Sequence, residues 1–218
     1  MDDSSVLPSA LAYLYGDVLE SVFIGKTRIG FSEKLACREV KVKKKDLATV
    51  MLVAGFALLR KTSQLSLAMG KTGRILKRRC VHATPTAQGI VQAGGLEAQI
   101  LAKVSGNLKR DDVASIVWRL WRADSGDPWG DVIRWGQEYL IAQGYFVEEE
   151  RRGIGKLLGR KRIPRCERVL ALLPEAEVLR AMLVAFRASE PEVYEQLWKD
   201  VRKGVGSRQE QQDVDFDD

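Results

Sequence analysis

The hydrophobic residues of this chain fall into helical runs separated by short segments of alternating character. After Pro8, apolar side chains recur at helical spacing and predict a helix that stops at Gly25. The run LATVMLVAGFALL, residues 47–59, is apolar on every side and follows Asp46, a suitable N-cap. A helix without a polar side is stable only when it is covered all round. We therefore predict that residues 47–59 form a central, buried helix.

Two segments with strand propensity follow this helix. QLSLAM and GRILKRRCV are separated by a turn bounded by Gly70 and Gly73, which predicts a β-hairpin. Pro85 ends the hairpin, because proline has no N–H to donate to the ladder. From Arg60 to Arg79 the chain holds seven Lys or Arg residues and no acid. The hairpin is therefore predicted to be strongly positive.

The second half repeats this order of elements with different residues. Asp111 and Asp112 cap the helical run VASIVWRLW, and Pro128 begins a second helix that Gly144 ends. YFVEEE and IGKLLGRKRI then predict a second basic hairpin. The order helix, helix, hairpin is typical of a winged helix. We predict a mainly α fold, a helical domain with two winged-helix-like helix–helix–β-hairpin units.

The remaining chain predicts a helical C-terminal part and two flexible ends. CERVLALL, PEAEVLRAMLVAFRA and EVYEQLWKDVRK are helical runs. Residues 204–218 have too little apolar content to fold and predict a disordered acidic tail. Residues 1–8 are expected to be a flexible N-terminus. Residues 9–203 are expected to form a single globular domain, with units near 9–90 and 108–203.

Composition indicates a globular protein with an anionic partner. The chain has 218 residues, 45% hydrophobic content, a formal net charge of +6 and a pI near 9.3. Residues 26–45 hold eight Lys or Arg against two Glu, and residues 151–165 hold seven against no acid. Residues 207–218 hold five acids against one Arg. The basic clusters favour nucleic acid, a lipid headgroup surface or an acidic protein as partner.

The cysteines and the apolar runs bear on the compartment. Cys37, Cys80 and Cys166 are far apart and form no CxxC motif, so neither a disulfide framework nor a zinc site is predicted. A reducing compartment fits this pattern. The N-terminus lacks the basic and apolar regions of a secretory signal. The apolar run 47–59 is shorter than the roughly 18 to 20 residues that span a bilayer. We expect a cytoplasmic protein, able to sit peripherally on the cytoplasmic face of a membrane.

The residues do not indicate catalytic chemistry. The single histidine, His82, lies at the end of a predicted strand, where a structural role is far commoner than general-base catalysis. GKT occurs twice, but neither copy is preceded by the glycine that a phosphate loop needs. Glu148, Glu149 and Glu150 follow one another along a predicted strand and so point to opposite faces. We therefore predict no enzymatic activity, no metal and no cofactor.

The predicted contact surface consists of the basic side chains of the two hairpins. Neither helix that precedes a hairpin displays the Arg, Lys, Asn or Gln face that reads a DNA groove. Phosphate contacts without sequence discrimination are compatible with basic hairpins. The candidate anion- or headgroup-binding residues are Arg74, Lys77, Arg78, Arg79, Lys156, Arg160, Lys161 and Arg162.

Two tryptophans stand out in the second half. Trp118 and Trp121 share a face of one predicted helix, beside Arg119 and Arg122. Core packing between helices is one interpretation. The other is an interfacial role at a headgroup layer, since indole suits a surface that is half apolar and half wet.

Two stretches resemble Golgi phosphoprotein 3-like proteins. LLRKTSQLSLAMGKTGRILKRRCVHATPTAQGIV is similar to the part of that family in which an apolar helix ends in a short turn, a strand pair follows, and a TPTGD segment leads to the next helix. YLIAQGYFVEEERRGIGKLLGRKRIP is similar to the family's next helix, glutamate-bearing strand and basic hairpin. The resemblance covers residues 45–187 and depends on order and spacing more than on identities. Ala87 and Gln88 stand where the family has Gly and Asp.

The resemblance implies a largely helical adaptor that binds anionic lipid headgroups, phosphoinositides in eukaryotic members, without catalysis. The family's headgroup pocket uses a Trp and an Arg before the central helix, where this chain has VKVKKKD, and only Arg134 lies near the family's further arginines. Our hypothesis is a non-enzymatic peripheral membrane protein that binds phosphoinositide-type headgroups through its basic hairpins. The alternative is a winged-helix protein that binds nucleic acid without strong sequence preference. A homo-oligomer or a protein partner stays open.

Overall fold

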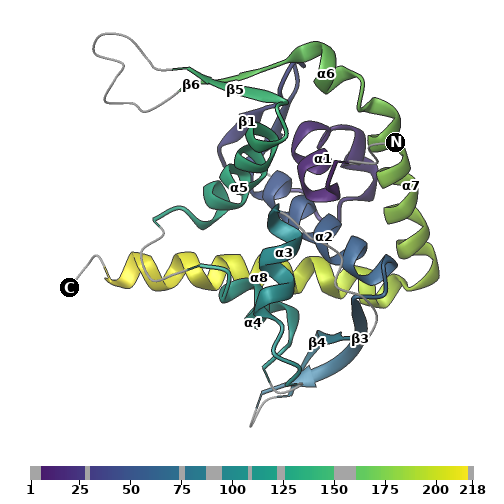
Figure 1. Cartoon of the computed structure of the whole chain (residues 1–218). Helices are drawn as coiled ribbons and strands as arrows, with labels where there is room; N and C mark the ends of the chain where they lie inside the picture. Colours follow the sequence, from purple (N-terminus) through teal and green to yellow (C-terminus); the bar gives the residue numbers. More distant parts are fainter. Residues whose placement is uncertain are drawn as a thin grey trace.

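We describe the protein from a computed structural model (Figure 1). The described residues are 6–27, 30–73, 77–86, 95–107, 110–121, 126–149 and 161–215. In chain order the elements are α1 (Pro8–Leu14), the 3-10 helix η1 (Val18–Val22), β1 (Ser32–Lys34), β2 (Lys41–Lys43), α2 (Lys44–Lys61), β3 (Leu65–Thr72), β4 (Arg78–Pro85), α3 (Gly95–Lys103), α4 (Val113–Trp118), α5 (Pro128–Ala142), β5 (Phe146–Glu149), β6 (Lys161–Pro164), α6 (Cys166–Leu170), α7 (Leu173–Ser189) and α8 (Pro191–Asp215). The fold is mainly helical, with small hairpin sheets.

α2 lies at the centre of the molecule, with α1, α3, α5 and α8 packed against it (Figure 1). Residues 46–57 are all buried, which confirms the prediction of a central helix covered on every side. The predicted N-cap is wrong, because the helix begins at Lys44, before Asp46. The Asp46 carboxylate accepts hydrogen bonds from the Thr27 N–H (2.9 Å) and from Arg202 (2.7 Å). Asp46 therefore ties the preceding loop and α8 to the central helix.

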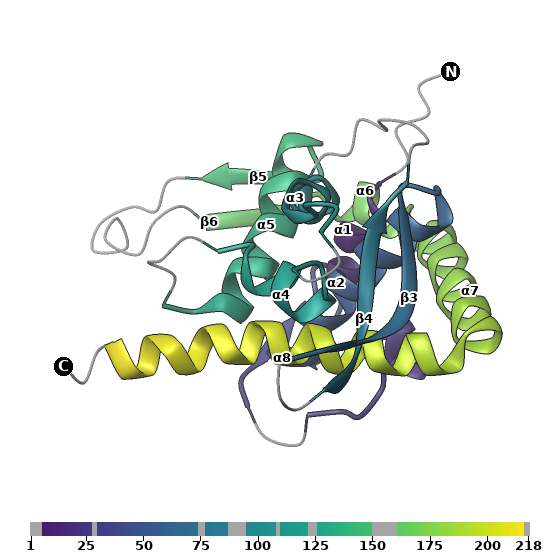
Figure 2. The same cartoon turned by 90° about the horizontal axis from the view of Figure 1, so that it is seen from below.

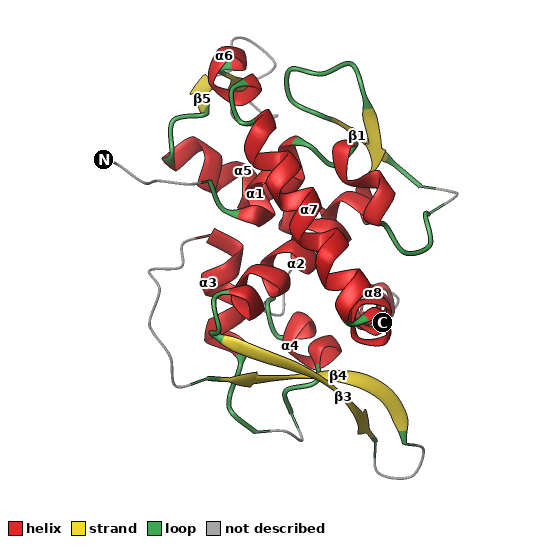
Figure 3. Cartoon of the chain, turned by 90° about the vertical axis from the view of Figure 1, so that its right-hand side faces the viewer, coloured by secondary structure: helices red, strands yellow, loops and turns green. Residues whose placement is uncertain are grey.

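The described strands form three separate antiparallel hairpins (Figure 3). β3 and β4 are eight residues long, with Thr72 opposite Arg78 at the turn end. β5 and β6 are four residues long, with Glu148 opposite Arg162. The strands of both predicted hairpins are present, whereas residues 150–160, which connect β5 to β6, and residues 74–76 of the first connection lie outside the described residues. A third hairpin, β1–β2, precedes α2.

Local capping signals place α4 and α5 where the sequence predicts them. Asp112 is the N-cap of α4, and its carboxylate accepts a hydrogen bond from the Ser115 N–H at 3.1 Å. Pro128 occupies the first position of α5. Gly144 follows α5 with a φ of 72°, a left-handed conformation that glycine adopts without strain.

The folded part of the chain extends further at both ends than the sequence predicts. Val6 is buried and α1 begins at Pro8, so the predicted flexible N-terminus is corrected for residues 6–8. The predicted disordered tail is corrected for residues 204–215, which continue α8 along the length of the molecule (Figure 2). Val205 is fully buried there. The rest of both predicted ends lies outside the described residues.

Gly204 lies where α8 packs closely against α4. A Cβ added to Gly204 would lie 2.6 Å from the Ala114 carbonyl oxygen and 2.8 Å from the Val117 Cβ. The glycine lets α8 approach the backbone of α4 and does not end the helix. Its role is therefore helix packing.

One hydrophobic core joins the two predicted units. Its residues run from Val6 to Val205 and come from both 9–90 and 108–203. None of the described helices combines the length and the apolar character that a membrane span requires.

A disulfide joins Cys37 to Cys166, with their Cα atoms 5.4 Å apart. The sequence predicted no disulfide, because 129 positions separate the two cysteines and no motif links them. The bond ties the connection between β1 and β2 to the first residue of α6. Cys80 is free and buried. Because two of the three cysteines form a disulfide, the cysteine pattern no longer indicates a reducing compartment.

Candidate anion-binding site

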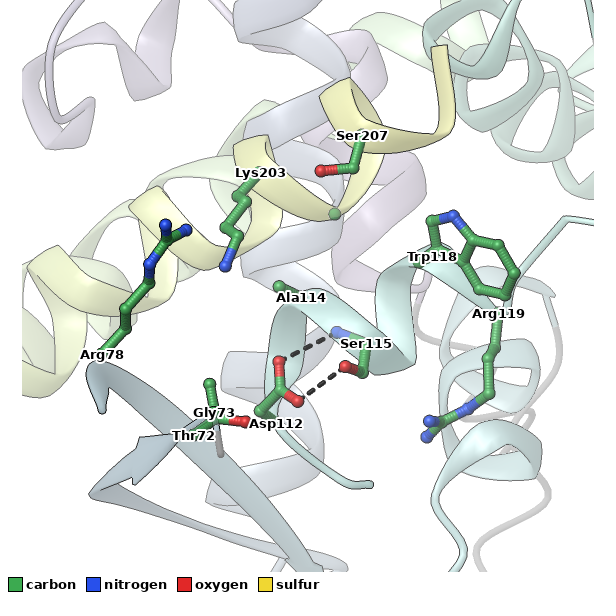
Figure 4. A pocket seen from close by; sticks show the side chains of 11 residues that line it. Thr72, Gly73, Arg78, Asp112, Ala114, Ser115, Trp118, Arg119, Lys203 and Ser207 are labelled. Atoms are coloured by element: carbon green, nitrogen blue, oxygen red, sulfur yellow. Dashed lines mark hydrogen bonds between the residues drawn. The ribbon is translucent and has the colours of Figure 1, made fainter. Parts of the chain in front are cut away.

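A cleft of about 620 Å³ opens where the turn end of the β3–β4 hairpin meets α4 and α8 (Figure 4). Basic, hydroxyl and aromatic side chains line it together. The lining residues are Thr72, Gly73, Arg78, Asp112, Ala114, Ser115, Trp118, Arg119, Lys203, Gly204 and Ser207. Arg78 and Lys203 lie at one end of the cleft, and Trp118 and Arg119 lie at the other. The cleft thus unites three segments that are far apart in the sequence.

Buried polar contacts hold β4 against α8. The Asp200 carboxylate accepts hydrogen bonds from the Val81 N–H at 2.7 Å and from the Gln196 amide at 2.9 Å. Gln196 also donates to the Arg79 carbonyl at 3.3 Å. Burial raises the pKa of Asp200, and the two hydrogen bonds oppose this rise. These contacts fix the base from which the turn end of the hairpin projects.

The acidic groups beside the cleft are occupied by bonds within the protein. Asp112 accepts hydrogen bonds from the N–H (3.1 Å) and hydroxyl (2.6 Å) of Ser115. Asp111 is buried and pairs with Arg119 at 2.9 Å, and the Arg119 guanidinium also donates to the Lys103 carbonyl at 2.9 Å. Arg119 therefore supports the cleft wall, and its charge is already balanced.

The remaining cations at this end of the hairpin are not balanced in this way. Lys71, Lys77, Arg78 and Lys203 are exposed and form no ion pair with an acidic side chain in the part of the chain that the structure describes. We call these four residues the β3–β4 basic patch. Arg78 and Lys203 line one end of the cleft, where they can bind phosphate or carboxylate oxygens, whereas Lys71 on β3 and Lys77 before β4 are not among its lining residues.

Two of the other predicted contact residues are paired with acids. Arg79 pairs with Glu192 at 3.1 Å, and both side chains are largely exposed, so the pair is weak. Arg162 donates a hydrogen bond to Gln137 and lies 3.5 Å from Glu148 and 4.0 Å from Glu138. The charge of Arg162 is therefore neutralised within its own hairpin region. The remaining predicted contact residues, Arg74, Lys156, Arg160 and the side chain of Lys161, lie outside the described residues.

The two hairpins do not form one surface. β5–β6 extends beside α5 and α6, whereas β3–β4 extends from the other end of the molecule, beneath α4 (Figures 1 and 2). Arg78 and Arg162 consequently face different surroundings. The structure brings Lys77, Arg78 and Arg79 together and separates them from Arg162.

The two predicted interfacial tryptophans are divided between surface and core. Trp118 is 39% exposed at the cleft, and the Arg208 guanidinium lies 5.2 Å from the centre of its ring. Trp121 is 8% exposed, and its ring centre is 5.5 Å from that of Trp135. An interfacial role is corrected for Trp121, which packs in the core. Trp118 keeps a surface from which it can contact a ligand.

Cys80 and His82 are two positions apart on β4, and the Cys80 Sγ lies 3.4 Å from the His82 Nε2. Such a pair acts as a nucleophile only when the thiol ionises. Burial and the negative charges of Asp200 and Asp112 raise the pKa of Cys80 to about 11. The thiol is therefore protonated at neutral pH. Among the described side chains, no group of three or more His, Cys, Asp or Glu residues could hold a metal ion.

The sequence did not identify the contribution of α4 and α8 to the cleft. Ser115, Lys203 and Ser207 line it, yet residues from 204 onward were predicted to be disordered. A usable signal was present, because Leu197, Val201 and Val205 continue the helical spacing through Gly204. That spacing would have extended the helix and placed Lys203 and Ser207 on one side of it.

No protein-family model, curated protein or solved structure matches this chain. The resemblance to Golgi phosphoprotein 3-like proteins therefore stays a prediction from the sequence.

Proposed function

We propose that this chain is a non-enzymatic peripheral adaptor that docks on an anionic lipid surface through the β3–β4 basic patch. The observation that carries the proposal is the placement of Lys71, Lys77 and Arg78 near the turn end of the hairpin, with Lys203 of α8 lining the same cleft as Arg78, and none of the four in an ion pair with an acid among the described residues. In this proposal the hairpin serves as the wing of a winged-helix-like unit. The Golgi phosphoprotein 3-like resemblance points in the same direction.

The energy that such a patch supplies is sufficient for reversible docking. Each Lys or Arg near an anionic leaflet contributes about 1 kcal/mol, so four side chains contribute on the order of 4 kcal/mol. Exposed charges are screened by salt over about 10 Å at 0.1 M. We therefore expect weak binding that high salt releases. The exposed indole of Trp118 adds an aromatic group of the kind that is enriched at headgroup depth.

The helices beside the hairpins support surface docking over groove reading. α2 precedes the β3–β4 hairpin and is buried through residues 46–57, so it has no face for a DNA groove. On α5, Arg134 pairs with Asp131 and lies 3.8 Å from Glu138. Neither helix offers an unpaired basic face. The phosphate contacts that the hairpin can make carry no base sequence information.

Vesicle flotation tests the proposal directly. The full chain is mixed with vesicles of neutral lipid, or of neutral lipid containing anionic phosphoinositide, and floated at low and at high salt. We expect flotation only with the anionic vesicles, and release at high salt. The double substitution Lys77→Glu with Arg78→Glu should weaken binding on the order of a hundredfold or more.

The matched control is the double substitution Lys34→Glu with Arg165→Glu. Both residues are exposed and the change in net charge is the same. Lys34 ends β1 and Arg165 directly precedes α6, and these two elements lie at the end of the molecule away from the β3–β4 hairpin (Figure 1). Equal loss of binding in both variants would mean that net charge, and not the patch, drives docking. Absence of flotation together with a shift of duplex DNA at matched salt would favour the nucleic-acid alternative.

A further inference from the structure

The Cys37–Cys166 disulfide joins the connection between β1 and β2 to α6 and is open to solvent on one side. Cys166 is exposed at the first position of α6, whereas Cys37 is partly buried against the hydrophobic core. A thiol reagent can therefore approach the bond from the Cys166 side of the folded chain. Exposed or strained disulfides are the ones that are readily reduced and serve regulation. This bond is consequently a candidate for redox control.

Two features of the β1–β2 hairpin oppose the closed connection. Cys37 has a φ of 59°, a left-handed conformation that is unfavourable for a residue with a Cβ. Lys34 lies directly opposite Lys41 in the strand register, and like charges at such a position repel each other. Both lysines are exposed, and neither forms an ion pair with an acidic side chain of the described residues. The connection should therefore open when the covalent link is broken.

The fold around the hairpin depends on contacts other than the disulfide. Val42 of β2 is buried, and so is Leu35 at the start of the connection. The Arg38 guanidinium pairs with Asp17 at 2.8 Å, and both side chains are partly exposed. Because Val42 and the central helix α2 stay in place, loss of the disulfide should loosen the connection, residues 35–40, and leave the rest of the chain folded.

We propose that the Cys37–Cys166 disulfide is a reversible redox switch: a dithiol reductant frees the β1–β2 connection from α6, and oxidation closes it again. In the closed state Lys34, Lys41 and Lys43 lie on one face of a short, fixed ribbon. In the open state these lysines separate. The redox state thus controls a basic surface distinct from the β3–β4 basic patch, and the proposal is independent of lipid docking.

The reduction balances as a thiol–disulfide exchange in two steps. A thiolate of the dithiol attacks the sulfur of the exposed Cys166, the S–S bond breaks, and Cys37 leaves as a thiolate that takes up a proton. The second thiolate of the reductant then attacks the reductant's own sulfur in the mixed disulfide and releases Cys166, which is protonated to the thiol. The two cysteines gain two electrons and two protons, and the dithiol becomes a disulfide.

Hydrogen–deuterium exchange of the full chain, measured by mass spectrometry before and after treatment with dithiothreitol, tests the switch. The reporters are the Leu35 N–H, which donates to the Val40 carbonyl at 3.0 Å, and the Arg38 N–H, which donates to the Leu35 carbonyl at 3.4 Å. We expect exchange in residues 35–40 to accelerate by about tenfold or more on reduction, whereas residues 46–57 of α2 should exchange as slowly as before.

Cysteine variants separate a switch from a structural bond. Cys37→Ser with Cys166→Ser should show the fast exchange of residues 35–40 without reductant and should still unfold cooperatively in a thermal melt. Cys80→Ser is the matched control, because Cys80 is free and buried, and it should respond to dithiothreitol as the wild type does. Three free thiols in the protein after mild oxidation, equal exchange in both redox states, or a double variant that does not fold would each overturn the proposal.

A charge substitution tests the contribution of the lysine pair. Lys34→Glu places an acid opposite Lys41 and should slow exchange of residues 35–40 severalfold in the reduced protein, with little change in the oxidised protein. Lys61→Glu, at an exposed position at the end of α2, is the matched control for net charge and should exchange like the wild type in both states. Equal exchange in the two reduced variants would overturn the opening role assigned to Lys34 and Lys41.

Discussion

The two basic hairpins look alike in the sequence and differ in their tertiary surroundings. The β3–β4 hairpin is long, is anchored on α8 through Asp200, and presents Lys77 and Arg78 without acidic partners among the described residues. The β5–β6 hairpin is short, and its described arginine, Arg162, lies among Gln137, Glu138 and Glu148. A count of basic residues in the sequence therefore does not measure the net charge that a hairpin surface presents.

The source of the difference is the position of the acids. In β5–β6 the neutralising Glu148 lies directly opposite Arg162 in the strand register, and Glu138 comes from the adjoining helix α5. In β3–β4 the nearby carboxylates of Asp112 and Asp200 accept hydrogen bonds from Ser115, Val81 and Gln196. These acids stabilise the scaffold, and among the described residues neither forms an ion pair with Lys77 or Arg78, although Asp200 interacts electrostatically with Lys203.

We expect the largest difference between the two hairpins from Asp200→Ala, which removes the anchor of β3–β4 and leaves β5–β6 intact. The Val81 N–H would then be buried without an acceptor, at a cost of about 1 to 3 kcal/mol in the free energy of unfolding. Vesicle binding should fall as well, because the basic patch loses its fixed base. Denaturant unfolding measures the first effect and flotation the second.

Asp200→Asn is the control, because its amide oxygen still accepts from Val81. It also tests a pH dependence. Since burial raises the pKa of Asp200, its contribution favours folding in acid and is lost as the pH rises from the ordinary carboxyl pKa through the raised value. The unfolding free energy of the wild-type protein should therefore decrease across that window more steeply than that of Asp200→Asn. Parallel pH profiles would contradict this role of Asp200.

Gly204→Ala tests the contact between α8 and α4, the two helices that line the cleft beside the β3–β4 hairpin. The new methyl group would meet the Ala114 carbonyl oxygen at 2.6 Å and should cost about 1 to 3 kcal/mol, partly offset by about 1 kcal/mol of helix propensity. Gly206→Ala on the same helix is the matched control, because nothing lies within 4 Å of its added Cβ. The control should be stabilised in thermal or denaturant unfolding. Shifts of the same sign in both variants would contradict close packing at Gly204.

Arg162→Glu should separate stability from binding in the β5–β6 hairpin. The new carboxylate would face Glu138 and Glu148 and would lose the bond to Gln137, which should lower the unfolding free energy by about 1 kcal/mol. Affinity for anionic vesicles should fall severalfold at most, far less than for Lys77→Glu with Arg78→Glu, because Arg162 is already paired with acids. A loss comparable to that of Lys77→Glu with Arg78→Glu would show that both hairpins contact the vesicle.

The smallest stability change is expected from Glu138→Gln with Glu148→Gln, which makes β5–β6 resemble β3–β4. These exposed or partly exposed ion pairs contribute less than about 1 kcal/mol to the unfolding free energy. Vesicle affinity should rise severalfold, because Arg162 is released and two negative charges are removed. An unchanged affinity in flotation would mean that β5–β6 does not approach the vesicle surface.

Local signals in the sequence predicted much of the fold correctly. The apolar run 47–59 identified the buried helix, because no polar side was available for solvent. Asp112 and Pro128 marked the starts of α4 and α5, because capping depends on residues within one helical turn. The low apolar content of residues 204–218 was misleading, because α8 continues to Asp215 and packs on α4 at Gly204.

The candidate site was predictable only in part. Lys77, Arg78 and Arg79 follow from the charge pattern of a hairpin, whereas Lys203 and Ser115 join them through the packing of α8 and α4. The sequence also did not predict that Trp118 is exposed and Trp121 is buried, because both lie on one predicted helix face. Spacing on one helix face does not by itself distinguish the exposed Trp118 from the buried Trp121.

The sequence by itself determined the positions of most helices and strands, the burial of the central helix and the positive sign of both hairpins. Only the tertiary structure decided that Arg162 is neutralised while Arg78 has no ion pair within the described residues, that Cys37 meets Cys166, and that Gly204 packs on α4. The physical reason is the range of the interactions. Helix and turn preferences depend on neighbours within a few positions, whereas charge pairing, disulfide formation and close packing depend on distances through space between residues far apart in the chain.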